Sequence, residues 1–192
     1  MDERVKRAMA QWPDVPDAYG WLSLDRRGGW RLQGERITNP ALVAFIGRNY
    51  GATGDGGFAF QNGPQRVHVQ LDIAPWIVHL APSSAAQEPA LIDHTGRLCD
   101  DLSAAWLDGD GQLWLQMNRG AAVLRDDALI HALDMIRGPS AKGWDEDLLS
   151  QPDQLDAADL RWRTTQGDIP LRALKTSPEE AFHFIRIPQA PS

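Results

Sequence analysis

The sequence predicts an α+β fold of two structurally related units, each an antiparallel sheet of hairpins with one main helix, plus an N-terminal helix. Three observations support this prediction. The 192 residues include 17 glycines and 13 prolines, which indicates many turns and short strands. Short segments alternate apolar with polar residues, as half-buried strands do. The same series of segments then recurs in the second half, and the chain is long enough for two small units.

The first 37 residues are expected to form a helix and a hairpin. Apolar side chains share one face of a helix over residues 2–11, namely Val5, Met9 and Trp12. From residue 19 to residue 37, two alternating segments flank the turn Asp25-Arg26-Arg27-Gly28-Gly29. We therefore expect a β-hairpin, because this turn is rich in residues that favour chain reversal.

A second helix and three strands complete the first half. Thr38 or Asn39 is expected to cap a helix with Pro40 at its first position, where the missing N–H has no partner to lose. The segment 51–57 is glycine-rich and is interpreted as a flexible break. Strands are predicted at residues 58–60, 67–71 and 76–80.

The second half repeats this order. Asp25-x-x-Gly28-x-Trp30-x-Leu32 has the spacing of Asp108-x-x-Gly111-x-Leu113-x-Leu115. Phe58, Phe60, Val67 and Val69 have the mutual offsets of Leu160, Trp162, Ile169 and Leu171. Asp126 is expected to cap the second helix, and a last strand is predicted at Phe182–Ile187. The agreement of order and spacing indicates an internal repeat.

These patterns define the expected organisation of the chain. Residues 1–18 form the N-terminal helix and connector, and residues 19–81 form the first α+β repeat unit. Residues 82–90, small and polar between prolines, form a linker. Residues 91–188 form the second unit, with an insertion at about 140–159. How the two units pack is left open.

Charge and cysteine content limit the classes of partner. The net charge is −7, so a nucleic acid is not expected as a partner. A single cysteine, Cys99, cannot form an internal disulfide, which favours a reducing cytoplasmic location. No signal peptide is expected from the N-terminus, and no apolar run reaches the length of about 18 residues that favours a membrane span.

Motifs of the first half resemble the proteobacterial domain-of-unknown-function family 1285. The residues that carry the resemblance are Gly28-Gly29-Trp30-x-x-x-Gly34-x-x-Ile37, Phe58-x-Phe60-x-x-x-Pro64-x-x-Val67-x-Val69 and Ala74-Pro75-Trp76-x-Val78. They span Tyr19 to Val78, whereas the second half only echoes the family at Trp162 and Gly167. Membership of that family or of a sister family implies two related α+β units and a role in signal transduction, without an established activity.

Candidate catalytic and metal-binding residues are few. The five histidines are His68, His79, His94, His131 and His183, and no pair has the spacing of a helical metal site. No metal and no cofactor is therefore expected. Asp108-Gly109-Asp110-Gly111 is interpreted as a hairpin turn instead of a calcium loop. Asp93, His94 and Cys99 form an alternative polar cluster, in which a cysteine–histidine pair would be oriented by a carboxylate.

Tryptophans of the two predicted hairpins form a candidate aromatic platform. Trp21 and Trp30 belong to the first hairpin, and Trp106 and Trp114 belong to the second. Arg31 and Arg36 lie beside the first pair in sequence. Stacked cross-strand rings would stabilise the sheets, whereas exposed rings would offer a flat binding surface.

These observations favour a non-catalytic ligand- or protein-binding module in bacterial signalling or regulation, with an unidentified small molecule or protein as its partner. Two alternatives remain open. The first is an enzyme with an unfamiliar site near His94 and Cys99. The second is a structural subunit that pairs through a sheet edge, in which case a second copy of the chain is the candidate partner.

Overall fold

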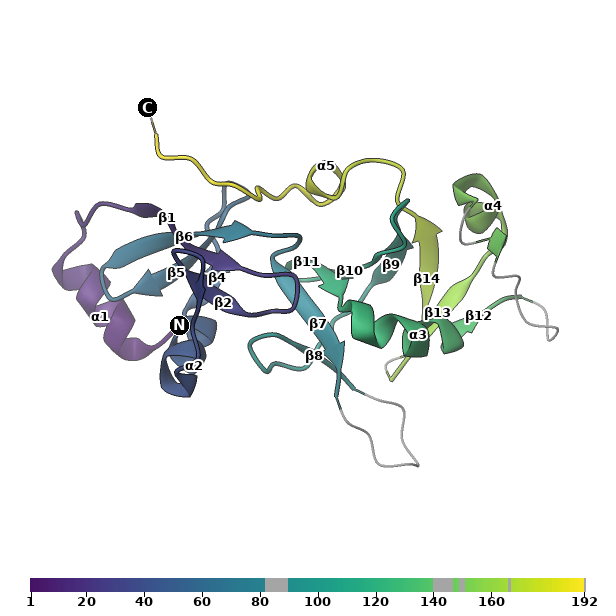
Figure 1. Ribbon diagram of the computed structural model, residues 1–192, viewed down its shortest axis with the longest axis horizontal. Helices are drawn as coiled ribbons and strands as arrows, with labels where there is room; N and C mark the ends of the chain where they lie inside the picture. The colour runs from purple at the N-terminus through teal and green to yellow at the C-terminus, as the bar shows by residue number, and fades with distance from the viewer. Residues whose placement is uncertain (82–89, 140–146, 149–150, 166, 192) are drawn as a thin grey trace. The chain divides into compact units, whose positions relative to one another are not determined.

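The computed structural model describes residues 1–81, 90–139, 147–148, 151–165 and 167–191. The chain forms two compact units (Figure 1). The first comprises Met1–Pro75 and His183–Ser192, and the second comprises Trp76–Phe182. The α+β class and the two related units predicted from the sequence are thus confirmed.

The first unit contains one sheet and two helices. Its helices are α1 (Glu3–Gln11) and α2 (Pro40–Arg48). Its strands are β1 (Ala18–Leu24), β2 (Trp30–Leu32), β3 (Glu35–Arg36), β4 (Tyr50–Ala52), β5 (Phe58–Asn62) and β6 (Gln65–Leu71). They lie in the order β3-β2-β1-β6-β5-β4, and the central pair β1–β6 is parallel.

The second unit repeats this order and adds two strands at one border. Its strands are β7 (Trp76–Leu80), β8 (Leu91–Asp93), β9 (Ala104–Leu107), β10 (Leu113–Met117), β11 (Gly120–Leu124), β12 (Ile136–Arg137), β13 (Arg161–Thr164) and β14 (Gly167–Ala173). Its helices are α3 (Asp126–Asp134), α4 (Pro152–Ala157) and α5 (Pro178–Phe182). The sheet order is β12-β13-β14-β9-β10-β11-β7-β8.

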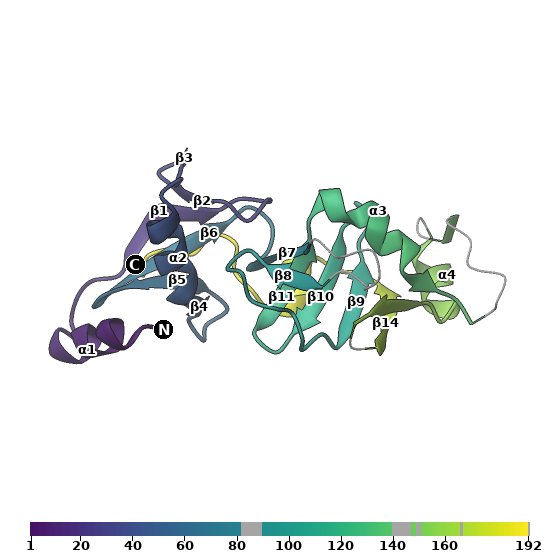
Figure 2. The same ribbon diagram turned by 90° about the horizontal axis from the view of Figure 1, so that it is seen from below.

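Strand register shows that the two units are equivalent. The pair Leu24↔Trp30 in the first unit corresponds to Leu107↔Leu113 in the second. The pair Phe60↔Val67 corresponds to Trp162↔Ile169, as the repeated offsets in the sequence predict. The helices also agree, since α2 and α3 have nine residues each and each connects the equivalent strands. Figure 2 shows α3 running over the sheet of its own unit.

The described part of the chain contains three copies of a five-residue turn that begins with aspartate. Asp25, Asp93 and Asp108 each begin the pattern Asp-x-x-Gly-x. Each accepts backbone N–H groups two and four residues later on Oδ1, at 2.8–3.1 Å. The second carboxylate oxygen is left to receive a side chain, which is Arg31, Arg119 and Trp114 respectively. The turn interpretation of residues 108–111 is confirmed.

The cap of α2 also follows the prediction. Asn39 Oδ1 accepts hydrogen bonds from the N–H groups of Ala41 and Leu42 at 3.0 and 3.1 Å, and Pro40 begins the helix. In α3 the expected cap was wrong. Asp126 is the first residue of the helix, and the preceding Arg125 makes no side-chain capping bond.

Several other expectations differ from the structure. Trp76–Leu80 was placed in the first unit, whereas β7 pairs in parallel with β11 in the second. The division of the chain between the units therefore falls after Pro75. Residues 82–89 of the expected linker lie outside the described residues, as does much of the expected insertion. The expected break at residues 51–57 begins with β4, in which Tyr50 pairs with Phe60.

The predicted last strand, Phe182–Ile187, was also wrong. Phe182 ends α5, and His183 has a left-handed backbone with φ of 54°. Ile185 N–H donates to Gly56 O, and Leu71 N–H donates to Arg186 O, so this segment is held by the first unit. The central strands of both sheets pair in parallel, although wholly antiparallel sheets were expected.

Replacing the cap residue tests the account of α2. Asn39→Ala should lower the free energy of unfolding by about 1 kcal/mol, because two N–H groups lose their acceptor. Thr38→Ala is the matched control, because Thr38 is exposed and Asn39, not Thr38, caps the helix; it should change stability by less than about 0.5 kcal/mol. Urea unfolding followed by circular dichroism measures both changes. Equal losses in the two variants would contradict the assignment of the cap.

Candidate functional site

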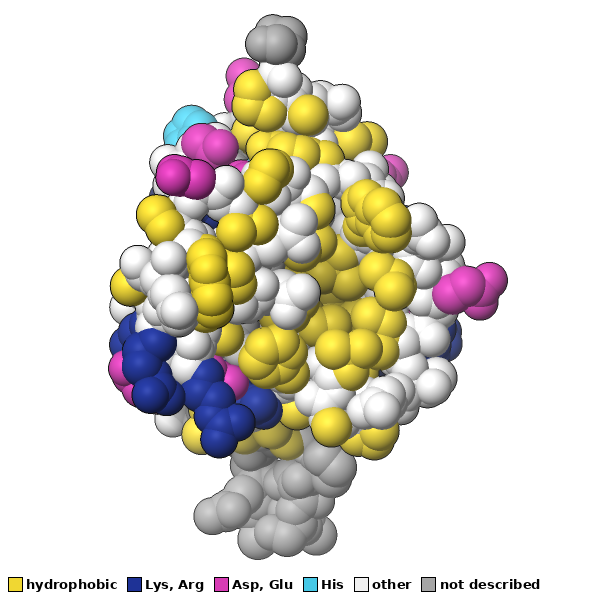
Figure 3. Space-filling model, turned by 90° about the vertical axis from the view of Figure 1, so that its left-hand side faces the viewer, with side chains coloured by type: hydrophobic (Ala, Val, Ile, Leu, Met, Phe, Trp, Pro, Cys, Tyr) yellow, Lys and Arg dark blue, Asp and Glu magenta, His cyan; other side chains and the backbone are white. Residues whose placement is uncertain are grey.

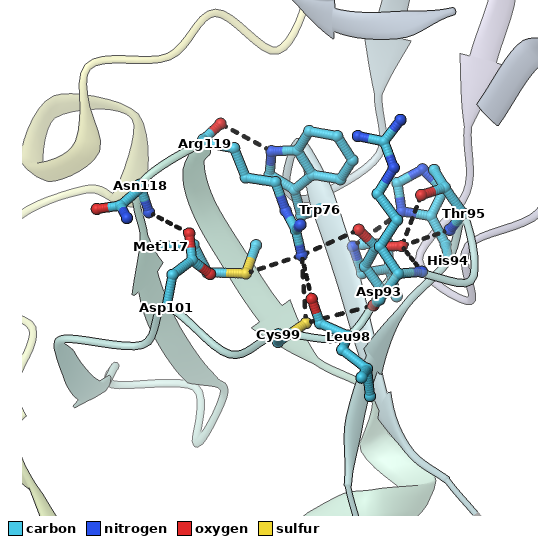
Figure 4. A network of polar contacts seen from close by, with 12 residues as sticks. Trp76, Asp93, His94, Thr95, Leu98, Cys99, Asp101, Met117, Asn118 and Arg119 are labelled. Carbon is cyan, nitrogen blue, oxygen red and sulfur yellow. Dashed lines mark hydrogen bonds and ion pairs between the residues drawn. The ribbon is translucent and has the colours of Figure 1, made fainter. Parts of the chain in front are cut away.

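The alternative polar cluster is built on the turn at Asp93. The carboxylate of Asp93 is fully buried. Its Oδ1 accepts hydrogen bonds from Thr95 N–H at 2.8 Å, Thr95 Oγ1 at 2.7 Å and Arg97 N–H at 3.1 Å. Its Oδ2 lies 3.1 Å from Arg119 Nη2 (Figure 4). The negative charge is therefore compensated by one cation and several donors, as a buried carboxylate requires.

Arg119 connects this carboxylate to sulfur and to an aromatic ring. Its Nη2 lies 3.5 Å from both Met117 Sδ and Cys99 Sγ. Its guanidinium carbon lies 5.1 Å from the Trp76 ring centroid, and its backbone oxygen accepts a hydrogen bond from Trp76 Nε1 at 3.0 Å. These contacts tie the β10–β11 turn to β7 and to the segment after β8.

His94 is neutral within this cluster. Ile77 N–H donates to His94 Nδ1 at 3.3 Å, which requires this nitrogen to be unprotonated. Burial lowers the pKa of His94 from 6.5 to about 4, and the guanidinium of Arg119 adds to the lowering. The nearby Asp93 charge opposes that shift without overcoming it. The imidazole thus serves as a hydrogen-bond acceptor for the sheet.

Cys99 is not arranged as a nucleophile. Burial raises the pKa of its thiol to about 12, so the reactive thiolate is not populated near neutral pH. The Arg119 guanidinium opposes this rise, and the Asp93 carboxylate adds to it. The structure brings Asp93, His94 and Cys99 into one cluster, as predicted, but their protonation states disfavour cysteine–histidine catalysis. Across the described residues, no three His, Cys, Asp or Glu side chains are grouped to hold a metal ion.

The predicted aromatic platform is only partly formed. Trp30 and Trp114 are buried in the cores of their units, and Trp30 packs edge-on to Tyr50 with centroids 5.0 Å apart. Trp106 and Trp114 pair directly across β9 and β10, and Phe182 contacts both rings. Trp21 is 54% exposed. The buried tryptophans therefore stabilise the sheets, and of the four tryptophans of the predicted platform only Trp21 has a largely exposed ring.

The two candidate arginines have different surroundings. Arg31 Nε donates to Asp25 Oδ2 at 3.1 Å and Nη1 donates to Gly34 O at 3.1 Å, so Arg31 stabilises the hairpin. Arg36 is exposed on β3 and lies opposite Arg31 in register. Of the two arginines, Arg36 is thus the one whose guanidinium is accessible to a ligand.

An apolar groove occupies the first unit between α2 and its sheet. Its volume is about 370 Å³. It is lined by residues of α2, β1, β2, β5, β6 and the loops beside them: Ala18, Trp21, Leu22, Leu32, Ile37, Leu42, Ile46, Phe60, Asn62, Gln65 and Val67. Leu32 and Leu42 are 47% and 41% exposed. Figure 3 shows a broad area of hydrophobic side chains on this side of the molecule, with Lys and Arg side chains at its lower left.

The equivalent layer of the second unit is closed. Trp162 is the equivalent of Phe60 in the first unit. Trp162 pairs with Ile136, and Phe60 pairs with Tyr50, and each of these partners begins the first strand after the main helix. Trp162 is 0% exposed, and its Nε1 donates to Ala132 O of α3 at 3.0 Å. Leu115, the equivalent of Leu32, is also 0% exposed. In the described residues of the second unit, these side chains therefore fill positions that border the groove in the first unit.

The sequence reasoning found Trp21 and missed the rest of this groove. The signal that was overlooked is the composition of α2, Pro-Ala-Leu-Val-Ala-Phe-Ile-Gly-Arg, which is apolar on nearly all sides. A helix on the surface of a small unit normally has a polar outer face. Exposed Leu42 and Ala44 on such a helix indicate an apolar surface that something else can cover.

The fold and these sites define an α+β protein of two repeat units. The family model DUF2944, described as "Protein of unknown function (DUF2946)", matches residues 1–189, and the chain belongs to this family. Among curated proteins, none matches the chain significantly. The expectation of family 1285 or a sister family is confirmed to the extent that the chain lies in an uncharacterised family with that kind of fold.

Solved structures of DUF1285 family proteins resemble this chain. One from Silicibacter pomeroyi DSS-3 has a TM-score of 0.53 and 17% identity, over 90% of this chain and 88% of that chain. One from Shewanella baltica OS155 has a TM-score of 0.45 and 17% identity, over 59% of this chain and 91% of that chain. At this identity the first likeness shows a shared fold alone. In the described residues, no helix has the length and apolar character to cross a bilayer.

The neutral state of His94 predicts a dependence of stability on pH. In the unfolded chain the His94 imidazole is protonated below about pH 6.5, whereas in the folded protein it is protonated only below about pH 4. Stability is therefore fully present above pH 6.5 and falls as the pH decreases toward 4. The loss from this group is on the order of 3 kcal/mol.

The variant His94→Asn isolates that contribution, because the asparagine oxygen can take the place of Nδ1 as acceptor for Ile77 N–H. Urea unfolding between pH 7 and pH 4 should give a shallower decline in stability for the variant than for the parent. Parallel declines in the two proteins would contradict the low pKa of His94.

The buried thiol predicts low chemical reactivity. In the folded protein at pH 8, Cys99 should react with an aromatic disulfide reagent far more slowly than in urea, because the thiol is both buried and protonated. The release of thiophenolate measures the rate. Labelling of the folded protein at the rate seen in urea would restore the enzyme alternative at this cluster.

Proposed function

We propose that the first unit is a non-catalytic binding module whose ligand places an apolar group in the groove beside α2. The observation that supports this most strongly is the contrast between the repeats. Trp162 is fully buried against α3 in the second unit, whereas the equivalent Phe60 lines an open groove in the first. Leaving apolar surface in water costs about 25 cal/mol per Å², and a bound apolar group would recover this free energy.

The groove has the size and lining of a binding site. Its volume of about 370 Å³ is within the range of about 300–1,000 Å³ typical of ligand sites. Hydrophobic side chains make up most of the lining. Asn62 and Gln65, opposite each other across β5 and β6, supply amide groups that can orient a polar part of the ligand.

The polar cluster favours binding over catalysis. Cys99 is protonated and His94 is neutral and engaged with the sheet, so this cluster supplies no nucleophile–base pair. A module that binds a ligand without transforming it is compatible with the signalling or regulatory role implied by the sequence resemblance. That role is part of the proposal.

Filling the groove tests the proposal. A neutral naphthylamine dye, whose fluorescence rises in apolar sites, should bind the parent protein at one saturable site. Phe60→Trp introduces the ring that closes the second unit, and Leu42→Glu places a charge at the groove. Each should weaken dye binding at least about tenfold without lowering the melting temperature markedly.

Ile130→Ala is the matched control, because Ile130 is an exposed apolar residue on α3 outside the groove. It should bind the dye as the parent does. If Phe60→Trp and Leu42→Glu bind the dye as tightly as the parent, the groove is not the binding site and the proposal fails.

A further inference from the structure

The two repeat units differ at one border of their sheets. In the second unit, β11 is covered by β7, which pairs with it in parallel. The equivalent strand of the first unit is β3, because it follows β2 as β11 follows β10. β3 ends the sheet order, and no strand of the described residues pairs with its outer side (Figure 2).

The backbone of β3 can accept an added strand. Ile37 N–H donates inward to Trp30 O, so Arg36 presents its N–H and C=O groups outward, because these groups alternate along a strand. Val123 is the equivalent residue of β11, and it lies opposite Ile77 of β7. Val78 O accepts from Arg125 N–H at 2.8 Å at the end of the same pairing.

Side chains of an added strand would alternate between two different surroundings. Leu32 and Ile37 line the apolar groove on one face of the sheet. Arg31 and Arg36 pair on the other face. In β7, Trp76 and Val78 lie in register with Ala122 and Leu124, which share the face of Leu115. An added strand would therefore place every second residue toward the groove and the others toward the arginines.

The charge of Arg36 indicates which residues of an added strand would lie on the face opposite the groove. The chain carries a net charge of −7, yet Arg36 on β3 is exposed, as are Arg26 and Arg27 in the turn between β1 and β2. None of the three forms an ion pair within the described part of the chain, whereas Arg31 is paired with Asp25. Exposed cations of this kind complement carboxylates on a partner and speed their encounter.

We propose that β3 binds an extended segment of a partner protein as an added parallel strand. The segment alternates apolar residues, which enter the groove, with acidic residues, which face Arg36. This inference rests on the proposed binding function of the groove and names its occupant. Main-chain hydrogen bonds supply affinity in such complexes, and the alternate side chains supply specificity.

A short peptide based on the sequence of β7 provides the probe. In acetyl-Ser-Trp-Glu-Val-Glu-Leu-Ser-amide, the residues equivalent to Ile77 and His79 are glutamate. Titration calorimetry with the full-length protein should show binding, and the peptide should displace the naphthylamine dye. The same peptide with lysine in place of glutamate should bind at least about tenfold more weakly, and Arg36→Glu should reverse this preference.

Two further measurements test for an added strand. The central valine of the peptide is equivalent to Val78, whose backbone groups point toward β11. N-methylation of this valine removes a backbone donor and should weaken binding at least about tenfold. Hydrogen exchange at the Arg36 amide should slow when the peptide is bound. Arg36→Gln serves as a milder second variant, which should abolish the preference between the two peptides.

The outcomes separate this inference from the proposed function. If the dye binds and the peptide does not, the strand inference is overturned and the groove function stands. If neither binds, both fail. Equal binding of the glutamate and lysine peptides, or undiminished binding of the N-methylated peptide, would also overturn the inference.

Discussion

The packing of one helix against one face of a small sheet governs both units. Each sheet joins its hairpins through a central parallel pair, β1–β6 or β9–β14, and a parallel pair cannot be closed by a tight turn. The connection between these strands carries α2 or α3 against the apolar face. Every large side chain in that layer must then fill the space between helix and sheet, because neither element is stable alone.

The repeats satisfy this constraint to different extents. In the second unit, Trp162 spans the layer and bonds to the backbone of α3, and β7 covers the border of the sheet. In the first unit, the equivalent Phe60 lines an open groove of about 370 Å³, and β3 remains at the border. The groove and the uncovered strand are thus two separate differences between the units. Together they leave an apolar groove and an unpaired sheet border in the described part of the first unit, whereas in the second unit Trp162 and β7 occupy the equivalent positions.

The polar cluster of the second unit shows why proximity of reactive side chains does not by itself indicate catalysis. Asp93 holds a turn and pairs with Arg119, while His94 accepts a hydrogen bond from β7. Cys99 lies beside this ion pair in a buried position that favours the protonated thiol. The same aspartate turn recurs at Asp25 and Asp108, where the free carboxylate oxygen receives another side chain. The shared arrangement is one of structural support.

The local structure could be predicted from the sequence, because turns, helix caps and the alternation of apolar and polar residues in strands depend on neighbouring residues. The hairpin at Asp25, the Asn39 cap and the offsets that relate Phe60 to Trp162 all follow from such spacing. Trp21 and the cluster of Asp93, His94 and Cys99 were also identified in this way. The unit joined by β7 and the openness of the layer beside α2 were decided only by tertiary structure. Both depend on strand pairing and side-chain volume contributed by distant segments, which spacing along the chain does not encode.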